Sequence, residues 1–120
     1  MSTYATAVLD GYLDALEWTE CGPDADDDIR NGSFSSDLQA RAHEDVSDFL
    51  NAASDVLPFL DVNPSQIGHD FWLTRNGHGV GFWDRPELYG DHEAERLTDI
   101  ARSFGTLFVY AGDDGDLYCT

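Results

Sequence analysis

The stretch HDFWLTRNGHGVGFWDR, residues 69–85, determines the fold that the sequence predicts. Residues 69–74 are aromatic and β-branched in character, and residues 80–84 repeat that character. Between them lies Asn76-Gly77, the strongest short-range signal for a β-hairpin turn. We therefore predict two antiparallel strands joined by a tight turn.

The tip of this predicted hairpin is a secondary candidate for a binding site. Arg75, Asn76 and His78 would project there. The glycines around them are best explained by turn geometry, because a phosphate-binding loop would lead into a helix and not into a strand. Trp72 and Trp83 would face each other across the two strands as a packed aromatic pair.

The sequence that follows predicts one helix and a second hairpin. Residues 91–103 place apolar side chains at helical spacing, and Gly105 provides a C-terminal stop. Residues 106–110 and 116–119 have strand composition on either side of the turn at 113–115.

The sequence that precedes residue 69 predicts helices and an exposed loop. Residues 3–18 and the segment from Ser36 to about residue 57 show helical periodicity, the second opened by an S-x-x-Q capping box. Residues 19–35 form a loop that is too rich in Asp to be buried. Residues 63–68 form a short helical turn that ends at Gly68.

These elements predict an α+β fold. The expected architecture is a two-layer domain in which a four-stranded antiparallel sheet, made of two hairpins, packs against about three helices. We expect one domain over residues 1–120, with an acidic helical half at 1–68 and a hairpin–helix–hairpin half at 69–120.

The composition is strongly acidic, with 24 Asp and Glu against 6 Arg, no Lys and a net charge of −18. This charge argues against direct binding of nucleic acid or of anionic membranes, which require Lys and Arg. The chain lacks an apolar run of the roughly 20 residues that a membrane span needs, and its start lacks a basic segment, so we expect no secretory signal. The two cysteines are expected to be reduced thiols.

Most of the acidic residues fall within residues 1–70. Acids at helical i, i+4 spacing lie about 6 Å apart along the axis, which is of the order of successive phosphates on one DNA strand. We therefore predict that these carboxylates bind a basic partner, although solubility alone remains an alternative interpretation. The candidate residues are Asp10, Asp14, Glu17, Asp24, Asp26, Asp27, Asp28, Glu44, Asp45 and Asp48.

Signals for enzymatic chemistry are weak. His69, Asp70, His78, Asp84 and His92 could converge on a metal, but none of the usual ligand spacings connects them. No nucleophile motif is present, and neither cysteine has a neighbour that would activate it. We expect no catalytic residue, no metal and no cofactor, and a metal-dependent hydrolase is a distant alternative.

The stretch at 69–85 also resembles a motif of small uncharacterised proteins from tailed phages and prophages. Leu97-Thr98, Phe104-Gly105 and the turn within residues 110–118 extend this resemblance over the second half of the chain. The resemblance implies a phage origin and a location in the host cytoplasm, and it supplies no activity.

The composition, in turn, is similar to that of acidic phage proteins that imitate DNA. This second resemblance implies a non-enzymatic inhibitor of a basic host defence protein, either a CRISPR effector or a restriction enzyme. We expect such a protein to act as a monomer. The alternative is a small acidic phage accessory or structural protein whose charge serves only solubility.

Overall fold

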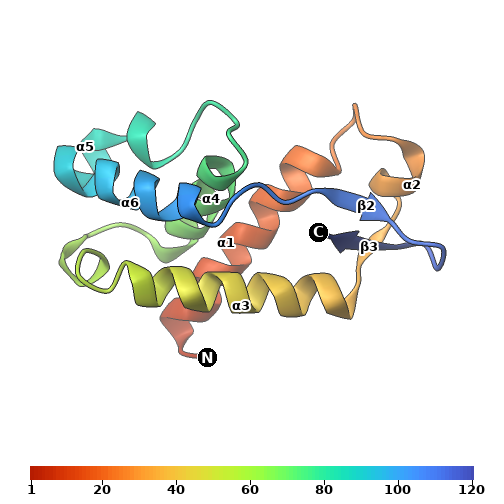
Figure 1. The fold of residues 1–120 in the computed structure, drawn as a ribbon, viewed down its shortest axis with the longest axis horizontal. Coiled ribbons are helices and arrows are strands. Elements are labelled where there is room, and N and C mark those ends of the chain that lie inside the picture. Colours follow the sequence, from red (N-terminus) through yellow and green to blue (C-terminus); the bar gives the residue numbers. More distant parts are fainter.

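The computed structural model describes residues 1–120 and is mainly helical (Figure 1). Its α-helices are α1 (Thr3–Glu20), α2 (Asp27–Arg30), α3 (Ser36–Ala52), α4 (Pro64–Arg75), α5 (Pro86–Tyr89) and α6 (Asp91–Ser103). Its 3-10 turns are η1 (Leu57–Phe59) and η2 (Phe82–Asp84), and its strands are β1 (Ser33–Phe34), β2 (Val109–Ala111) and β3 (Asp116–Cys119).

The segment at 69–85 is not a hairpin. The Asn63 side chain caps α4 and Pro64 starts it, as expected, but the helix continues through Gly68 to Arg75. The predicted strand at 69–74 is therefore the second half of a helix. Nearly all residues of this segment are buried, so its apolar side chains show no helical periodicity. A short apolar run of this kind looks the same in the sequence of a buried helix as in that of a buried strand.

The Asn76-Gly77 pair ends this helix instead of turning a hairpin. Gly77 has a φ of 64°, and its N–H donates to the Thr74 carbonyl at 3.2 Å. The next N–H, that of His78, donates to the Leu73 carbonyl at 3.1 Å. These two bonds form a Schellman motif, which requires the same left-handed glycine that a hairpin turn requires.

Gly68 does not stop the helix, because it is the point where α4 crosses α1. A Cβ atom on Gly68 would lie 1.8 Å from the Val8 carbonyl oxygen of α1. Conversely, a Cβ atom on Gly11 of α1 would lie 1.9 Å from the Ser65 carbonyl oxygen of α4. The two backbones approach this closely only because both positions are glycine.

The two tryptophans of the segment have different environments and do not form a pair. Trp72 is completely buried, and its indole N–H donates to the Thr19 hydroxyl of α1 at 2.8 Å. Trp83 lies in η2 and keeps 47% of its surface exposed. The predicted cross-strand aromatic pair is therefore wrong, since there are no strands to present it.

A stack of aromatic rings forms the centre of the core. Phe49 of α3 stacks on Phe71 of α4 with ring centroids 4.2 Å apart, and on Phe82 at 5.7 Å. Tyr12 of α1 also packs against Phe71, with ring centroids 5.2 Å apart. These rings belong to one apolar cluster that joins α1, α3, α4 and α6.

The second predicted hairpin is confirmed, but its first strand is Val109–Ala111 and not residues 106–110. β2 and β3 pair antiparallel around the turn at 113–115. β1 then adds to β3 in parallel, which gives a three-stranded mixed sheet in the order β1-β3-β2. The expected four-stranded antiparallel sheet with two hairpins is wrong, because its first hairpin is helical and its third observed strand comes from the acidic loop.

The three long helices outside this region follow the sequence prediction closely, whereas the short helix α2 forms inside the predicted loop at 19–35, and α5 was not expected. α1 and α6 correspond to the predicted helices at 3–18 and 91–103. α3 begins at Ser36, but its cap is Ser35, whose hydroxyl accepts from the Leu38 N–H at 3.0 Å. It ends at Ala52, earlier than expected.

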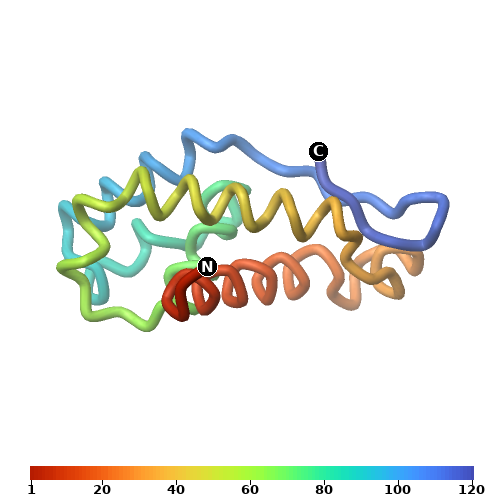
Figure 2. The backbone as a smooth tube through the Cα atoms, turned by 90° about the horizontal axis from the view of Figure 1, so that it is seen from below, coloured from red at the N-terminus to blue at the C-terminus, as the bar shows by residue number.

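The molecule has one long axis, with dimensions of 43 × 29 × 22 Å and a radius of gyration of 14.2 Å. Figures 1 and 2 show α2 and the β2–β3 hairpin at one end of this axis, and η1 and α5 at the other. The boundary expected between residues 68 and 69 falls inside α4. None of the helices combines the length and the apolar composition that crossing a bilayer requires.

Candidate functional site

Almost all of the carboxylates lie at the surface. Of the 24 acidic residues only Asp45 and Asp70 are buried. Among the predicted binding residues, Asp10, Asp14 and Glu17 lie on α1 opposite its buried side, and Glu44 and Asp48 are exposed on α3. Asp24, Asp26, Asp27 and Asp28 are exposed in the loop and in α2, as expected.

Asp45 is the exception, and it is not available to a partner. One of its oxygens accepts from Nη1 of Arg75 at 2.6 Å, and Arg41 Nε lies 3.0–3.1 Å from both oxygens. The carboxylate lies on the buried side of α3, only 6% exposed, and it balances the charge of Arg75 inside the core. Asp45 is therefore a structural residue.

Arg75 was predicted at a hairpin tip, and the structure places it in the core instead. Its guanidinium also donates to the Tyr12 hydroxyl at 3.1 Å and to the carbonyls of Phe104 and Gly105 at 3.1 and 2.9 Å. It thereby connects α4 to α1, to α3 and to the C-terminal end of α6, where a cation also interacts favourably with the helix dipole.

The other two residues of the predicted tip have separate roles. Asn76 is the C-cap of α4, and its side-chain oxygen accepts from the Leu107 N–H at 2.8 Å. His78 is exposed in the loop that follows, with Nε2 3.9 Å from a Glu20 carboxylate oxygen. The structure therefore does not bring Arg75, Asn76 and His78 together as a binding site.

The residues weighed as a distant alternative metal site do not form one. Asp70 is fully buried and accepts hydrogen bonds from Tyr89 at 2.7 Å, from Gln66 at 3.1 Å and from Arg85 at 3.1 Å. His69 lies next to it, with Nδ1 3.9 Å from its carboxylate. The structure contains no group of three or more His, Cys, Asp or Glu side chains placed to hold a metal.

The ion pairs around the buried carboxylates of Asp45 and Asp70 leave the surface with few arginine partners. The two buried carboxylates bind Arg41, Arg75 and Arg85, which is half of the arginines. Two of the remaining arginines, Arg30 and Arg96, pair with single exposed carboxylates. Most surface carboxylates therefore have no arginine partner.

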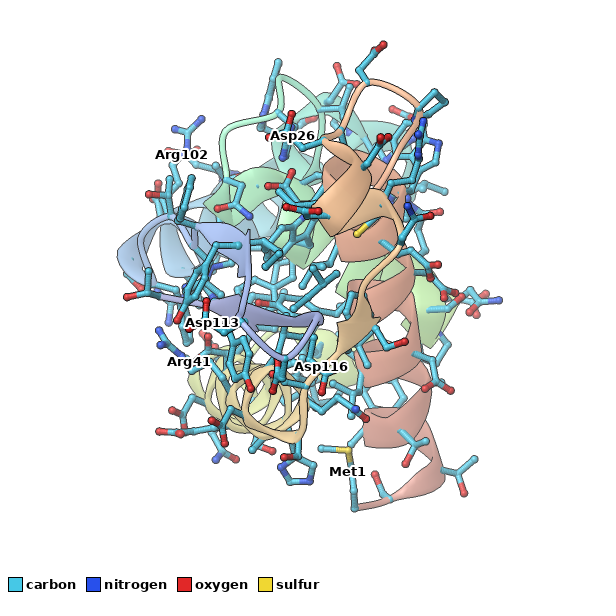
Figure 3. All side chains as sticks on the ribbon, turned by 90° about the vertical axis from the view of Figure 1, so that its right-hand side faces the viewer. Met1, Asp26, Arg41, Arg102, Asp113 and Asp116 are labelled. Carbon is cyan, nitrogen blue, oxygen red and sulfur yellow. The ribbon has the colours of Figure 1, made fainter.

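The structure also brings two distant acidic segments together. A groove of about 510 Å³ lies between α2 and the β2–β3 turn, and three carboxylates line it: Asp27, Asp28 and Asp113. We call the surface formed by Asp26, Asp27, Asp28, Asp113, Asp114 and Asp116 the acidic end. Figure 3 looks onto it and shows Asp26 above Asp113 and Asp116.

Sequence reasoning found only the first half of this surface. The sequence identifies Asp113 and Asp114 only as turn residues, since nothing in the local pattern places them beside α2. The turn at 113–115 lies beside α2 because β1, which follows α2 in the sequence, pairs with β3.

Comparison with family models, with curated proteins and with solved structures gives no match to this chain.

One carboxylate of the acidic end is fixed in place. Asp114 accepts the hydroxyl of Tyr118 at 2.6 Å and the N–H of Asp116 at 2.9 Å. The hydrogen bond from Tyr118 is the main cause that lowers the pKa of Asp114, and the same bond raises the pKa of Tyr118 to about 12. Tyr118 thus keeps its proton, and stays bound to Asp114, across the physiological range.

Substitution of Asp114 by asparagine is expected to move the Tyr118 pKa from about 12 back toward its ordinary value of 10.0. The raised pKa means that this bond stabilises the folded state below about pH 10, and that the contribution disappears as the pH rises toward 12. NMR titration of the tyrosine ring carbons measures the shift. Asp113→Asn, which removes a neighbouring carboxylate without a bond to the phenol, is the control and should leave the Tyr118 titration unchanged.

Proposed function

We propose that this chain is a non-enzymatic inhibitor that presents a DNA-like anionic surface to a basic, DNA-binding protein. The observation that supports this proposal is the uneven distribution of charge: two buried carboxylates bind half of the arginines, while the other 22 of the 24 carboxylates lie outside the core. A surface built in this way attracts a positively charged channel and accelerates association with it.

The density of charge supports the same proposal. Duplex DNA carries one negative charge per about 1.7 Å of its axis, so a segment as long as this molecule, 43 Å, carries roughly 25 phosphates. The chain has 24 acidic residues over the same length. Its charge is therefore of the right order to replace a short duplex in a binding channel.

The class of partner follows from the resemblances described above. A phage protein of this kind would act in the host cytoplasm on a CRISPR effector or a restriction enzyme, and it would compete with DNA without touching nucleic acid itself. The second possibility, an accessory or structural protein whose charge serves solubility, predicts no competition with DNA.

The decisive measurement is inhibition of DNA binding by such effectors at several salt concentrations. We expect wild-type protein to compete with duplex DNA, and we expect its affinity to fall steeply as salt rises. A variant with Asp26→Asn, Asp27→Asn, Asp28→Asn, Asp113→Asn and Asp116→Asn, all at the acidic end, should inhibit at least about tenfold less, mainly through slower association.

A matched variant changes the same number of carboxylates away from the acidic end: Asp61→Asn, Asp84→Asn, Glu87→Gln, Glu95→Gln and Asp99→Asn. It should lose clearly less inhibition, because the net charge is equal and only the position differs. Equal inhibition by wild type and by both folded variants would reject the proposal. Absence of any inhibition, together with a gradual loss of solubility in both variants, would favour the solubility interpretation.

A further inference from the structure

The outward side of the β2–β3 hairpin carries three aromatic side chains in a row. Phe108 and Tyr110 are 67% and 39% exposed, and their rings stack with centroids 6.5 Å apart. Tyr110 and Tyr118 face each other across the two strands and stack at 5.9 Å. We call these three residues the aromatic face. Val109 and Leu117 point the opposite way and are buried.

The ring of Tyr118 is held in a defined position. It lies across Gly112, where a Cβ atom would be only 2.4 Å from the ring carbon Cε1. Its hydroxyl is bound to Asp114, and its other neighbour is the stacked ring of Tyr110. The aromatic face is thus ordered before any partner arrives, which lowers the entropic cost of binding.

Carboxylates lie beside the aromatic face at Tyr110 and Tyr118. A shallow hollow of about 340 Å³ is lined by Tyr110, Gly112, Asp113, Asp114 and Tyr118. After the hydrogen bond from its hydroxyl to Asp114 and burial, the charges of Asp114, Asp116 and Asp37 also raise the pKa of Tyr118. Arg41, labelled at this end in Figure 3, is bound to Asp45.

A row of partly exposed aromatic rings with carboxylates beside it matches one side chain in particular. The guanidinium of arginine is planar, stacks on aromatic rings and donates in its own plane to carboxylates. The lysine ammonium carries the same charge, but it is strongly hydrated and cannot stack. A chain without exposed aromatic rings could attract both residues equally, whereas this face distinguishes them.

We propose that the aromatic face, with Asp113 and Asp114, binds an arginine side chain of the protein partner. The inference rests on the proposed function, since it describes how a basic partner is held. It adds specificity to that function: the net charge brings the partner near, and the hairpin selects arginine over lysine.

The test uses two synthetic peptides of equal length and charge, one of alternating arginine and glycine and one of alternating lysine and glycine. Calorimetry should show that the arginine peptide binds wild-type protein about fivefold more tightly, the size expected for an exposed stacked guanidinium. NMR should show that the ring signals of Tyr110 and Tyr118 shift with the arginine peptide more than with the lysine peptide.

Phe108→Ser combined with Tyr110→Ser leaves the net charge unchanged and should abolish the preference for arginine. The control is Phe59→Ser, which removes an aromatic ring that is 86% exposed in η1, at the other end of the molecule. It should keep the preference, and circular dichroism verifies that both variants remain folded.

Equal binding of the two peptides to wild type, or a preference that survives the double substitution, would overturn the inference. Either result would leave the competition with DNA untouched, because that competition depends on the carboxylates of the acidic end and not on the aromatic rings. Failure of wild-type protein to bind either peptide would also overturn it, whereas the proposed function is judged by the DNA assay alone.

Discussion

Replacement of Arg75 by methionine is expected to lower the free energy of unfolding by about 3–5 kcal/mol, the cost of removing one partner from a buried ion pair. Methionine fills a similar space, but Asp45 would keep its charge inside the protein with only Arg41 beside it. The hydroxyl of Tyr12 and two carbonyls at the end of α6 would also lose a donor. Urea denaturation measures the change.

Two further variants make this result specific. Arg102→Met changes an exposed arginine that forms no ion pair, and it should alter stability by less than about 0.5 kcal/mol. Asp45→Asn combined with Arg75→Met removes the uncompensated charge and should recover part of the loss. A loss below about 1 kcal/mol for Arg75→Met alone would contradict the structural role of this residue.

Replacement of Gly68 by alanine is expected to destabilise the protein by about 3 kcal/mol or more, the upper range for overpacking. In an exposed helix the same change would stabilise by about 1 kcal/mol. Here the added methyl group would lie 1.8 Å from the Val8 carbonyl oxygen, so α1 and α4 must move apart. Thermal and urea unfolding both measure the effect.

The control for helix propensity is Ala40→Gly, at an exposed position of α3. It should cost about 1 kcal/mol, which isolates the intrinsic preference for alanine from the packing at the crossing. Gly11→Ala should behave like Gly68→Ala, because its methyl group would meet the Ser65 carbonyl at 1.9 Å. An unchanged or increased stability of Gly68→Ala would show that the two helices do not cross this closely.

The sequence predicts correctly those elements whose signals are local. The helix at 91–103 and the turn at 113–115 carry their own periodicity, stop and turn residues, so no distant contact is needed to recognise them. Residues 69–77 carry ambiguous signals instead. Asn-Gly serves a helix C-cap as well as a hairpin, and Gly68 has the appearance of a helix stop until its neighbour on α1 is known.

The positions of the candidate site residues are likewise predictable only where they depend on local sequence. Charge alone predicts that Asp26, Asp27 and Asp28 are exposed, because unpaired carboxylates are costly to bury. The sequence around Asp45 does not distinguish it from the exposed acidic residues. Its burial depends on the ion pair with Arg75, which is 30 positions away along the chain. The meeting of Asp113 with α2 likewise depends on strand pairing that no local pattern encodes.

The crossing of α1 and α4 determines which parts of the chain unfold locally. The Thr19–Trp72 hydrogen bond, which belongs to this interface, joins residues 53 positions apart, so neither helix can reach its native contacts without closing a long loop. Backbones in direct contact leave no space for one helix to slide or fray while the other stays in place. Amide protons of α1 and α4 should therefore exchange with solvent together, at the slowest rate in the protein, while those of α2 and the loop at 76–81 exchange much earlier.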